Sequence, residues 1–347
     1  MAERVLVTGA EGFIGHHLVK FLAARGAWVR GVDISHPVFE RSAAHEFACL
    51  DLRSTDNCLD AVCGVDVVYH LAADTGTGAA GDDGRAARSN AMIDLNMLEA
   101  ARLNGVRRFL FSSSGAVYPR YLPDRAKTVP LREDDAFPAD PGSTDGLEKL
   151  FMETLCQSYA ESHGLETRIA RIHDVYGPLC ALDAGDETAP ASICRKVACA
   201  AADEAIEIEC DAEPARAFTY IHDCVEGLYR IMQSDCRAPL NLGTDAAVTI
   251  EQIVDIVSAI AGKSVTLRRG HSRPRTAVPA RNGDHTLLRY VLGWKPRVPL
   301  ELGLIPTYRW ISNQLARRHA ACAPYETVHE TSPLPETIRS PRHIAAI

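Results

Sequence analysis

A glycine-rich turn close to the N-terminus constrains the fold more than any other feature of this chain. The segment RVLVTGA, residues 4–10, is a short apolar run rich in β-branched residues that ends in glycine, as buried parallel strands often do. The next segment, GFIGHHLVKFLAARG, carries apolar residues at helical spacing and ends at Gly26, a helix stop signal. Strand, glycine turn and helix in this order predict that the chain opens with a βαβ unit.

Alternating strands and helices continue through the first half of the chain. WVRGVD, EFACLDL, VDVVYHLAA, RRFLFSSS and ETRIARIHDVYGP are typical of strands. Helices are expected over residues 90–103 and in the segment that contains Asp145 and Lys149. This alternation predicts an α/β fold with a Rossmann-type, doubly wound parallel sheet.

The pattern also suggests how the chain divides. We expect residues 1–177 to form a dinucleotide-binding domain to which later segments return. Beyond this point we expect helices over 190–202 and 300–318, the strand IEIEC, and a helix entered through capping-box spacing at Thr249 and Gln252. We assign residues 178–318 mainly to a smaller C-terminal substrate-binding α/β subdomain and residues 319–347 to a tail.

Composition narrows the possible partners. The 347 residues include 37 Lys and Arg against 45 Asp and Glu, and this net charge of -8 argues against a nucleic-acid partner. There is no run of about 18 apolar residues and no apolar leader, so no membrane association is expected. The 11 cysteines have neither CxxC nor His-rich partner spacing, which indicates reduced thiols in the cytoplasm and no metal site.

The glycine turn has the spacing of a dinucleotide-binding site. Gly9, Gly12 and Gly15 form GxxGxxG between the first strand and helix, where backbone N–H groups can approach a pyrophosphate at the helix N-terminus. Asp33 ends the second strand, 18 residues after Gly15, and its carboxylate would accept hydrogen bonds from the adenosine ribose. Because that carboxylate would repel a 2′-phosphate, the spacing favours NAD over NADP, although a simple turn aspartate is the alternative.

The other expected cofactor contacts lie in the same turn or follow the third and fourth strands, where they would border the adenine and the pyrophosphate. They are Phe13, Ile14, Asp51, Leu52, Leu71, Ala72 and Ala73. His70, which precedes this last group, is more simply interpreted as a hydrogen-bonded structural histidine.

Taken with SSSGAVYP, residues 112–119, and RIHDVYGP, residues 171–178, these features resemble the extended short-chain dehydrogenase/reductase family of nucleotide-sugar enzymes over residues 3–315. Within it, NAMIDLNMLEAARLNGVRRF, LREDDAFPADPGSTDGLEKL, APASICRK, FTYIHDCVEG and RNGD with LGWKP are similar to the GDP-mannose 3,5-epimerase group. The resemblance implies NAD-dependent oxidation of a GDP-hexose at C4, inversion of C5, C3 or both next to the ketone, and return of the hydride.

The resemblance also implies roles for single residues. Lys149 would hold the nicotinamide ribose, and Ser114 would hydrogen-bond the C4 oxygen. The family's catalytic tyrosine position holds Asp145, and its cysteine and lysine positions hold Ala116 and Asp183. An ordinary aspartate has a pKa near ~3.9 against ~10 for tyrosine, so Asp145 is either a perturbed acid/base or a carboxylate favoured at a helix N-terminus. Likewise, the acidic run at Asp183 either shuttles protons or is a solvated loop.

Substrate contacts are implied in the same way. Arg216 in ARAFTYIHD and Arg281 in ARNGD match diphosphate-binding arginines, and Lys196 would join them. Gly76, Ser114 and Asp174 are expected near the sugar. A homodimer through helices 90–103 and 147–162 is also implied. Two alternatives stay open: a nucleotide-sugar and NAD-binding protein without turnover, and a related dehydratase or decarboxylase.

Overall fold

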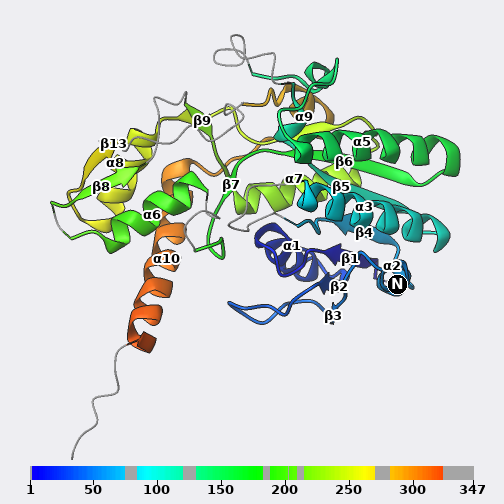
Figure 1. The fold of residues 1–347 in the computed structure, drawn as a ribbon, viewed down its shortest axis with the longest axis horizontal. Helices are drawn as coiled ribbons and strands as arrows, with labels where there is room; N and C mark the ends of the chain where they lie inside the picture. Colours follow the sequence, from blue (N-terminus) through cyan, green and yellow to red (C-terminus); the bar gives the residue numbers. More distant parts are fainter. Residues whose placement is uncertain are drawn as a thin grey trace, which may run out of the picture.

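A seven-stranded parallel sheet forms the centre of the computed structural model, which describes residues 2–74, 84–119, 130–182, 188–201, 203–208, 215–269 and 282–322. The strand order is β11-β6-β5-β4-β1-β2-β3, and every neighbouring pair is parallel (Figure 1). This confirms the predicted doubly wound α/β fold. The strands are β1 (Arg4–Thr8), β2 (Trp28–Asp33), β3 (Glu46–Cys49), β4 (Val67–His70), β5 (Arg108–Ser114), β6 (Glu166–Ile172) and β11 (Leu240–Leu242).

Helices cover both faces of the sheet and make two separate cores. Along β1, Val5 and Val7 belong to one core and Leu6 to the other, because successive side chains of a strand point to opposite faces. The first core is closed by α1 (Phe13–Ala24), α7 (Ile221–Gln233) and α9 (Thr286–Leu292). The second is closed by α2 (Thr55–Val62), α3 (Arg85–Leu103) and α5 (Thr144–His163).

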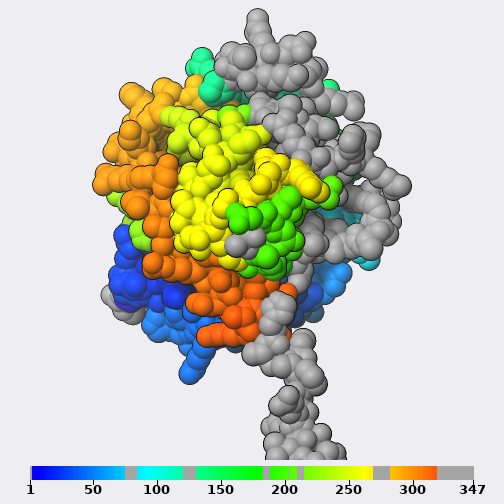
Figure 2. Space-filling model, turned by 90° about the vertical axis from the view of Figure 1, so that its left-hand side faces the viewer, coloured from blue at the N-terminus to red at the C-terminus, as the bar shows by residue number. Residues whose placement is uncertain are grey.

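A third core lies in a smaller group of elements beside the sheet (Figure 1). It contains α6 (Ala189–Cys199), α8 (Ile250–Ala261), α10 (Leu300–Cys322) and the parallel pair β8 (Ala205–Ile208) and β13 (Thr266–Arg269). Figure 2 looks onto this group, with α8 in yellow and α10 in orange at the surface. Two short pairs join it to the sheet region: β7 (Val175–Tyr176) with β10 (Thr219–Tyr220), and β9 (Arg216–Ala217) with β12 (Ala247–Val248).

Several element boundaries differ from the expected ones. The strand predicted across ETRIARIHDVYGP is two strands, because β6 ends at Ile172 and the chain leaves the main sheet to pair β7 with β10. Helix α3 begins five residues earlier than expected, after Gly84 in the left-handed conformation with φ 78°. Helix α6 is shorter than predicted, and α10 extends to Cys322. The predicted capping box is present, since the Thr249 side chain accepts from Gln252 N at 3.2 Å and the Gln252 side chain from Thr249 N at 2.8 Å.

Two 3₁₀ turns, Gly115–Val117 and Glu133–Ala136, lie on the chain between β5 and α5. Among the helices of the described part, none combines the length and the apolar character that crossing a bilayer requires.

A buried ion pair holds α5 against β6. Arg171 donates to both carboxylate oxygens of Glu153, at 2.9 Å from Nε and 2.7 Å from Nη2, and both side chains are almost completely buried. Ser113 also donates to Glu153, and Arg171 Nη1 donates to the backbone oxygen of Glu133 at 2.7 Å. The pair therefore connects α5, β5, β6 and the 3₁₀ turn at Glu133–Ala136.

Glu153→Gln should destabilise the protein by about 3 kcal/mol, because removing one partner of a buried pair leaves the other charge uncompensated. Urea unfolding at pH 7 measures this change. Glu161→Gln, an exposed position on the same helix, should change the free energy of unfolding by less than about 0.5 kcal/mol. Equal effects at the two positions would show that the Arg171 pair contributes nothing specific.

Candidate active site

The glycine turn between β1 and α1 leaves no room for side chains. Gly9 has φ 67°, and a Cβ there would lie 2.8 Å from the carbonyl oxygen of Leu71. A Cβ on Gly15 would lie 2.0 Å from the oxygen of Gly9, so the helix packs directly on the turn. Gly12 is the N-cap of α1. This arrangement is the one that lets backbone N–H groups approach a phosphate at a helix N-terminus.

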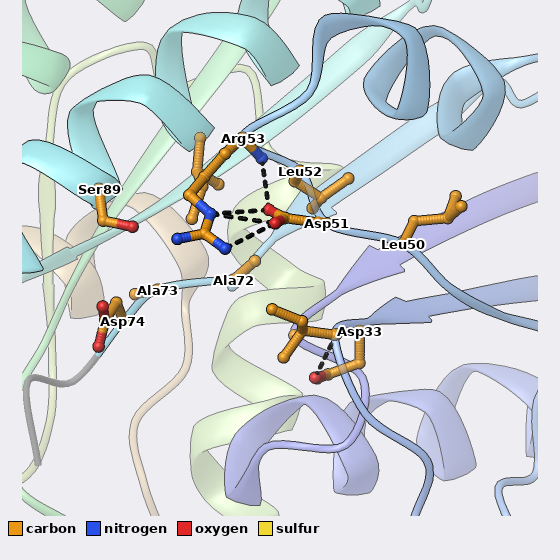
Figure 3. Close-up of a pocket in the computed structure, with 12 residues that line it drawn as sticks. Asp33, Leu50, Asp51, Leu52, Arg53, Ala72, Ala73, Asp74 and Ser89 are labelled. Atoms are coloured by element: carbon orange, nitrogen blue, oxygen red, sulfur yellow. Dashed lines mark hydrogen bonds and ion pairs between the residues drawn. The ribbon is translucent and has the colours of Figure 1, made fainter.

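A pocket of about 380 Å³ opens next to this turn, at the carboxyl ends of β1 to β4. Asp33 at its edge accepts hydrogen bonds from Glu11 N at 3.0 Å and Ile34 N at 2.7 Å. Figure 3 shows Asp33 apart from the paired Asp51 and Arg53. The pocket is lined by Gly9, Asp33, Ile34, Leu50, Asp51, Leu52, Arg53, Ala72, Ala73, Asp74, Ser89 and Ile93.

Six of the twelve predicted cofactor residues, Gly9, Asp33, Asp51, Leu52, Ala72 and Ala73, therefore share one pocket. Those not on its wall are Gly12, Phe13, Ile14, Gly15, Leu71 and Lys149; the side chains of Phe13, Ile14 and Leu71 pack against the first core. Arg53 was missed by the sequence analysis. Its guanidinium lies 2.6 Å from Asp51, and this hydrogen bond lowers the pKa of the Asp51 carboxyl. The short spacing between Asp51 and Arg53 is the signal that could have suggested the pair.

Lys149 lies in a buried polar chain that reaches back to β1. Its Nζ is 3.3 Å from Asp94 Oδ2, and Asp94 Oδ1 is 2.8 Å from His70 Nε2. His70 Nδ1 is 2.8 Å from Thr8 Oγ1, which accepts hydrogen bonds from the backbone N–H groups of Leu71 and Ala72. The Thr8 proton therefore goes to Nδ1, so Nε2 carries the ring proton and donates to Asp94. Both ring nitrogens of His70 are satisfied, as expected of a structural histidine.

The two carboxyl groups beside Lys149 differ in their protonation state. Burial opposes ionisation of Asp94, but the Lys149 ammonium and the His70 hydrogen bond lower its pKa to about 2. Burial raises the pKa of Glu148 to about 9, with the neighbouring Asp94 acting in the same direction. Glu148 Oε2 is 3.6 Å from Lys149 Nζ, but the lysine charge only partly offsets that effect. At neutral pH the cluster thus holds charged Lys149, charged Asp94 and protonated Glu148.

The start of α5 packs on the turn that follows Ser114. A Cβ on Gly146 would lie 2.2 Å from the oxygen of Ala116. Ser114 Oγ accepts from Ala116 N at 3.1 Å, which leaves its hydroxyl proton available to another acceptor. Asp145 lies half-buried in the first turn of α5, where its charge acts on both Lys149 and Glu148. Ser114, Ala116, Asp145 and Lys149 therefore belong to one corner, and both interpretations of Asp145 stay open.

The predicted substrate contacts are only partly brought together. Arg216 Nη2 lies 2.9 Å from Asp174 Oδ2, so these two predicted residues form an ion pair. Lys196 instead donates to the backbone oxygen of Glu207 in β8 at 2.7 Å. The remaining three predicted positions, Gly76, Asp183 and Arg281, lie outside the described residues.

One set of metal-type ligands occurs elsewhere among the described residues: His222, Asp223 and Glu226. Asp223 Oδ2 accepts from Arg297 N at 2.8 Å and Val298 N at 2.7 Å, and Glu226 pairs with Arg230 at 2.7 Å. Both carboxylates thus serve the packing of α7, and this set gives no reason to infer a metal ion.

Comparisons with known proteins agree with this geometry. The model of the NAD dependent epimerase/dehydratase family matches residues 5–243. Among curated proteins, GDP-mannose 3,5-epimerase 1 of Oryza sativa subsp. japonica is 39% identical over 318 residues, which cover 90% of this chain and 83% of that protein. UDP-glucuronic acid decarboxylase 1 of Arabidopsis thaliana is 30% identical over 312 residues, covering 87% and 68%.

Among solved structures, the UDP-glucose 4-epimerase of Thermotoga maritima, determined with UDP-glucose, has a TM-score of 0.79 at 26% identity. The UDP-glucuronic acid 4-epimerase of Bacillus cereus, determined with NAD, has a TM-score of 0.74 at 28% identity. Each alignment covers 90% of this chain and 99% of the other.

Glu148→Gln should stabilise the protein above pH 5. Between its unfolded pKa, near ~4.3, and its folded pKa of about 9, Glu148 keeps its proton only in the folded state. The unfolded state then binds fewer protons, so stability falls as pH rises, by at most about 1.4 kcal/mol per pH unit. Glutamine removes this dependence, because its amide does not ionise in this pH range.

Urea unfolding at pH 5 and pH 8 measures the effect. The free energy of unfolding of the variant should equal that of the wild type at pH 5 and exceed it by about 1 kcal/mol or more at pH 8. Glu161→Gln on the exposed face of α5 is the matched control and should shift neither value. A loss of stability in Glu148→Gln at pH 8 would mean that Glu148 is ionised and paired with Lys149.

Proposed function

Because the chain belongs to the NAD dependent epimerase/dehydratase family, we propose that it epimerises GDP-mannose at C5, C3 or both through a transient 4-keto sugar. The observation that carries this proposal is the 39% identity to a GDP-mannose 3,5-epimerase over 90% of the chain. The buried Lys149 beside the turn after Ser114 supports it, because these are the two groups that would address the sugar C4 and the adjoining ribose.

NAD is the cofactor of this family, and the residues of the pocket fit it. The closely packed glycine turn suits a pyrophosphate, Asp33 suits an unphosphorylated ribose, and Lys149 has donors for the second ribose. When bound, NAD supplies a hydride acceptor and donor for the sugar C4. Lys149 stays charged for this task, because the Asp94 carboxylate outweighs burial and raises the pKa of its ammonium.

Ser114 and Arg216 would orient the substrate. The Ser114 hydroxyl already accepts from Ala116 N, so its proton would be donated to the C4 oxygen, where negative charge develops when the adjacent carbon is deprotonated. Arg216 pairs with Asp174, and a guanidinium fork in that position suits a diphosphate. Arg281, Lys196 and Gly76 remain proposed contacts, and Asp183 remains a proposed proton shuttle.

A second candidate function follows from the residues that stand at the family's acid/base positions. Asp145 and Ala116 stand at the positions that the resemblance assigns to a tyrosine and a cysteine. Loss of a positioned general acid/base typically costs about 10²–10⁴-fold in rate. These two residues favour, as the alternative, a nucleotide-sugar and NAD-binding protein without turnover. A dehydratase or decarboxylase reaction, as in the more distant relatives, would also begin with C4 oxidation and meet the same obstacle.

We propose the cytoplasm as the compartment of this enzyme. The nine cysteines within residues 2–74, 130–182, 188–201 and 215–269 are free thiols. This agrees with a reducing environment, in which disulfides are rare.

Asp145→Tyr should accelerate exchange of the sugar hydrogens by about 10²–10⁴-fold, because a phenol would replace a poor base next to Lys149. The assay is proton NMR of GDP-mannose with NAD and protein in D₂O, following the hydrogens at C3 and C5. Asp255→Tyr, exposed on α8, is the control and should match the slow wild type. Binding of both ligands with no exchange in either the wild type or Asp145→Tyr would leave the binding protein as the correct interpretation.

We also propose a homodimer through α3 and α5, which pack side by side. Among the large apolar side chains exposed on them are Met92 at 47%, Leu95 at 39%, Leu147 at 58% and Phe151 at 52%. Their spacings of three and four residues place each pair on one helix face. A second copy of the chain is the partner that this surface would take.

Phe151→Glu should convert the dimer to a monomer, because a carboxylate would be buried in an apolar interface. Light scattering after size-exclusion chromatography gives the mass directly. Tyr290→Glu, at an 86% exposed position on α9, should leave the mass unchanged. A wild type that is already monomeric at micromolar concentration would refute the dimer.

A further inference from the structure

His173 lies at the same edge of the sheet as the proposed sugar site. It directly follows β6, and its backbone N–H donates to Leu242 O of β11 at 3.1 Å. The residue is partly exposed as a whole, and its ring lies between two glycines: a Cβ on Gly115 would be 3.1 Å from Nδ1, and one on Gly283 would be 2.5 Å from Nε2. Gly115 is the residue after Ser114. In open α/β sheets, ligands bind outside the carboxyl ends of the strands, where this ring is.

The hydrogen bonds fix the tautomer of His173. Nε2 is 3.1 Å from Asn241 Oδ1. The Asn241 amide nitrogen donates to Leu131 O at 2.9 Å and Asp284 O at 3.0 Å, which orients the amide so that Oδ1 is the acceptor. Nε2 therefore carries the proton, and Nδ1 presents a lone pair.

That lone pair is free and stays unprotonated. No hydrogen bond within the described part of the chain uses His173 Nδ1. Burial and the adjacent His285 lower the pKa of the His173 ring to about 4, although Asn241 and Asp174 act in the opposite direction; Arg171 adds to the lowering. Nδ1 is thus an acceptor and not a donor over the whole neutral range. Glycine at position 115 keeps the approach to it open, since any side chain there would press on the ring.

We propose that His173 is a substrate-contacting residue whose Nδ1 accepts a hydrogen bond from a hydroxyl of the hexose. This rests on the proposed function, because it takes the ligand to be a nucleotide-bound hexose placed beside Ser114. Sugar hydroxyls supply donors, and a neutral acceptor next to the Ser114 hydroxyl, a donor, gives the site one group of each kind. His173 would then distinguish a hexose nucleotide from the nucleotide alone.

Titration calorimetry of the full chain saturated with NAD tests the proposal, with GDP-mannose and GDP as the two ligands. His173→Phe should weaken the binding of GDP-mannose by roughly 3- to 10-fold, which is the effect of losing one neutral hydrogen bond. The affinity for GDP should be unchanged. His173→Asn, whose amide oxygen can take the place of Nδ1, should restore part of the loss. His222→Phe, an exposed histidine on α7, should affect neither ligand.

The loss of GDP-mannose affinity in His173→Phe, relative to the wild type, should also be the same at pH 8 and pH 5, because an ordinary histidine would become charged near ~6.5 whereas His173 does not. If His173→Phe weakened the binding of GDP and of GDP-mannose equally, or left the preference for GDP-mannose over GDP unchanged, the assignment of His173 would be overturned. The proposed function would stay in place. A wild type that binds GDP-mannose no more tightly than GDP would overturn the proposed substrate, and the role of His173 with it.

Discussion

A carboxylate with no solvent exposure, Asp94, is the group on which the active-site corner depends. Removing its charge from water is costly, and the cost is offset only because Lys149 and His70 lie against its two oxygens. Through these contacts Asp94 on α3 holds α5 and β4 in fixed positions, and through Thr8 it reaches the strand that leads into the glycine turn. The pocket beside the glycine turn and the corner that contains Lys149 are thereby joined by one hydrogen-bonded chain.

This arrangement changes what Lys149 can do. In the family that this sequence resembles, the corresponding lysine lowers the pKa of a tyrosine four residues earlier. Here Asp145 occupies that position, and the lysine charge is largely neutralised by Asp94, with Glu148 kept protonated beside it. A lysine in this setting is suited to holding a ribose more than to activating a base. In the proposed reaction, the groups left to address the sugar are the Ser114 hydroxyl, Asp145 and the neutral ring of His173.

Much of the fold followed from local patterns, and the exceptions have physical causes. The glycine spacing, the buried apolar strands and the capping box at Thr249 each describe interactions between neighbours in the chain, so they could be predicted without a structure. The division of β6 from β7 could not, because the chain turns at His173 and Asp174 to meet β10, over 40 residues away. For the same reason Asp94 was overlooked, whereas Asp33 and Lys149 were found from their motifs.

The sequence by itself determined the sheet, the glycine turn and the identity of the residues in the tyrosine and cysteine positions. Only the tertiary structure decided which groups are charged and which are free. Glu148 and Glu153 are five residues apart on one helix, yet one faces Asp94 and holds its proton, and the other faces Arg171 in an ion pair. Likewise, His70 ends one parallel strand and His173 follows another. Asp94 and Thr8 hydrogen-bond both ring nitrogens of His70, whereas Asn241 hydrogen-bonds one ring nitrogen of His173. Protonation and hydrogen-bonding capacity depend on burial and on partners brought from distant segments, and spacing along the chain does not encode either.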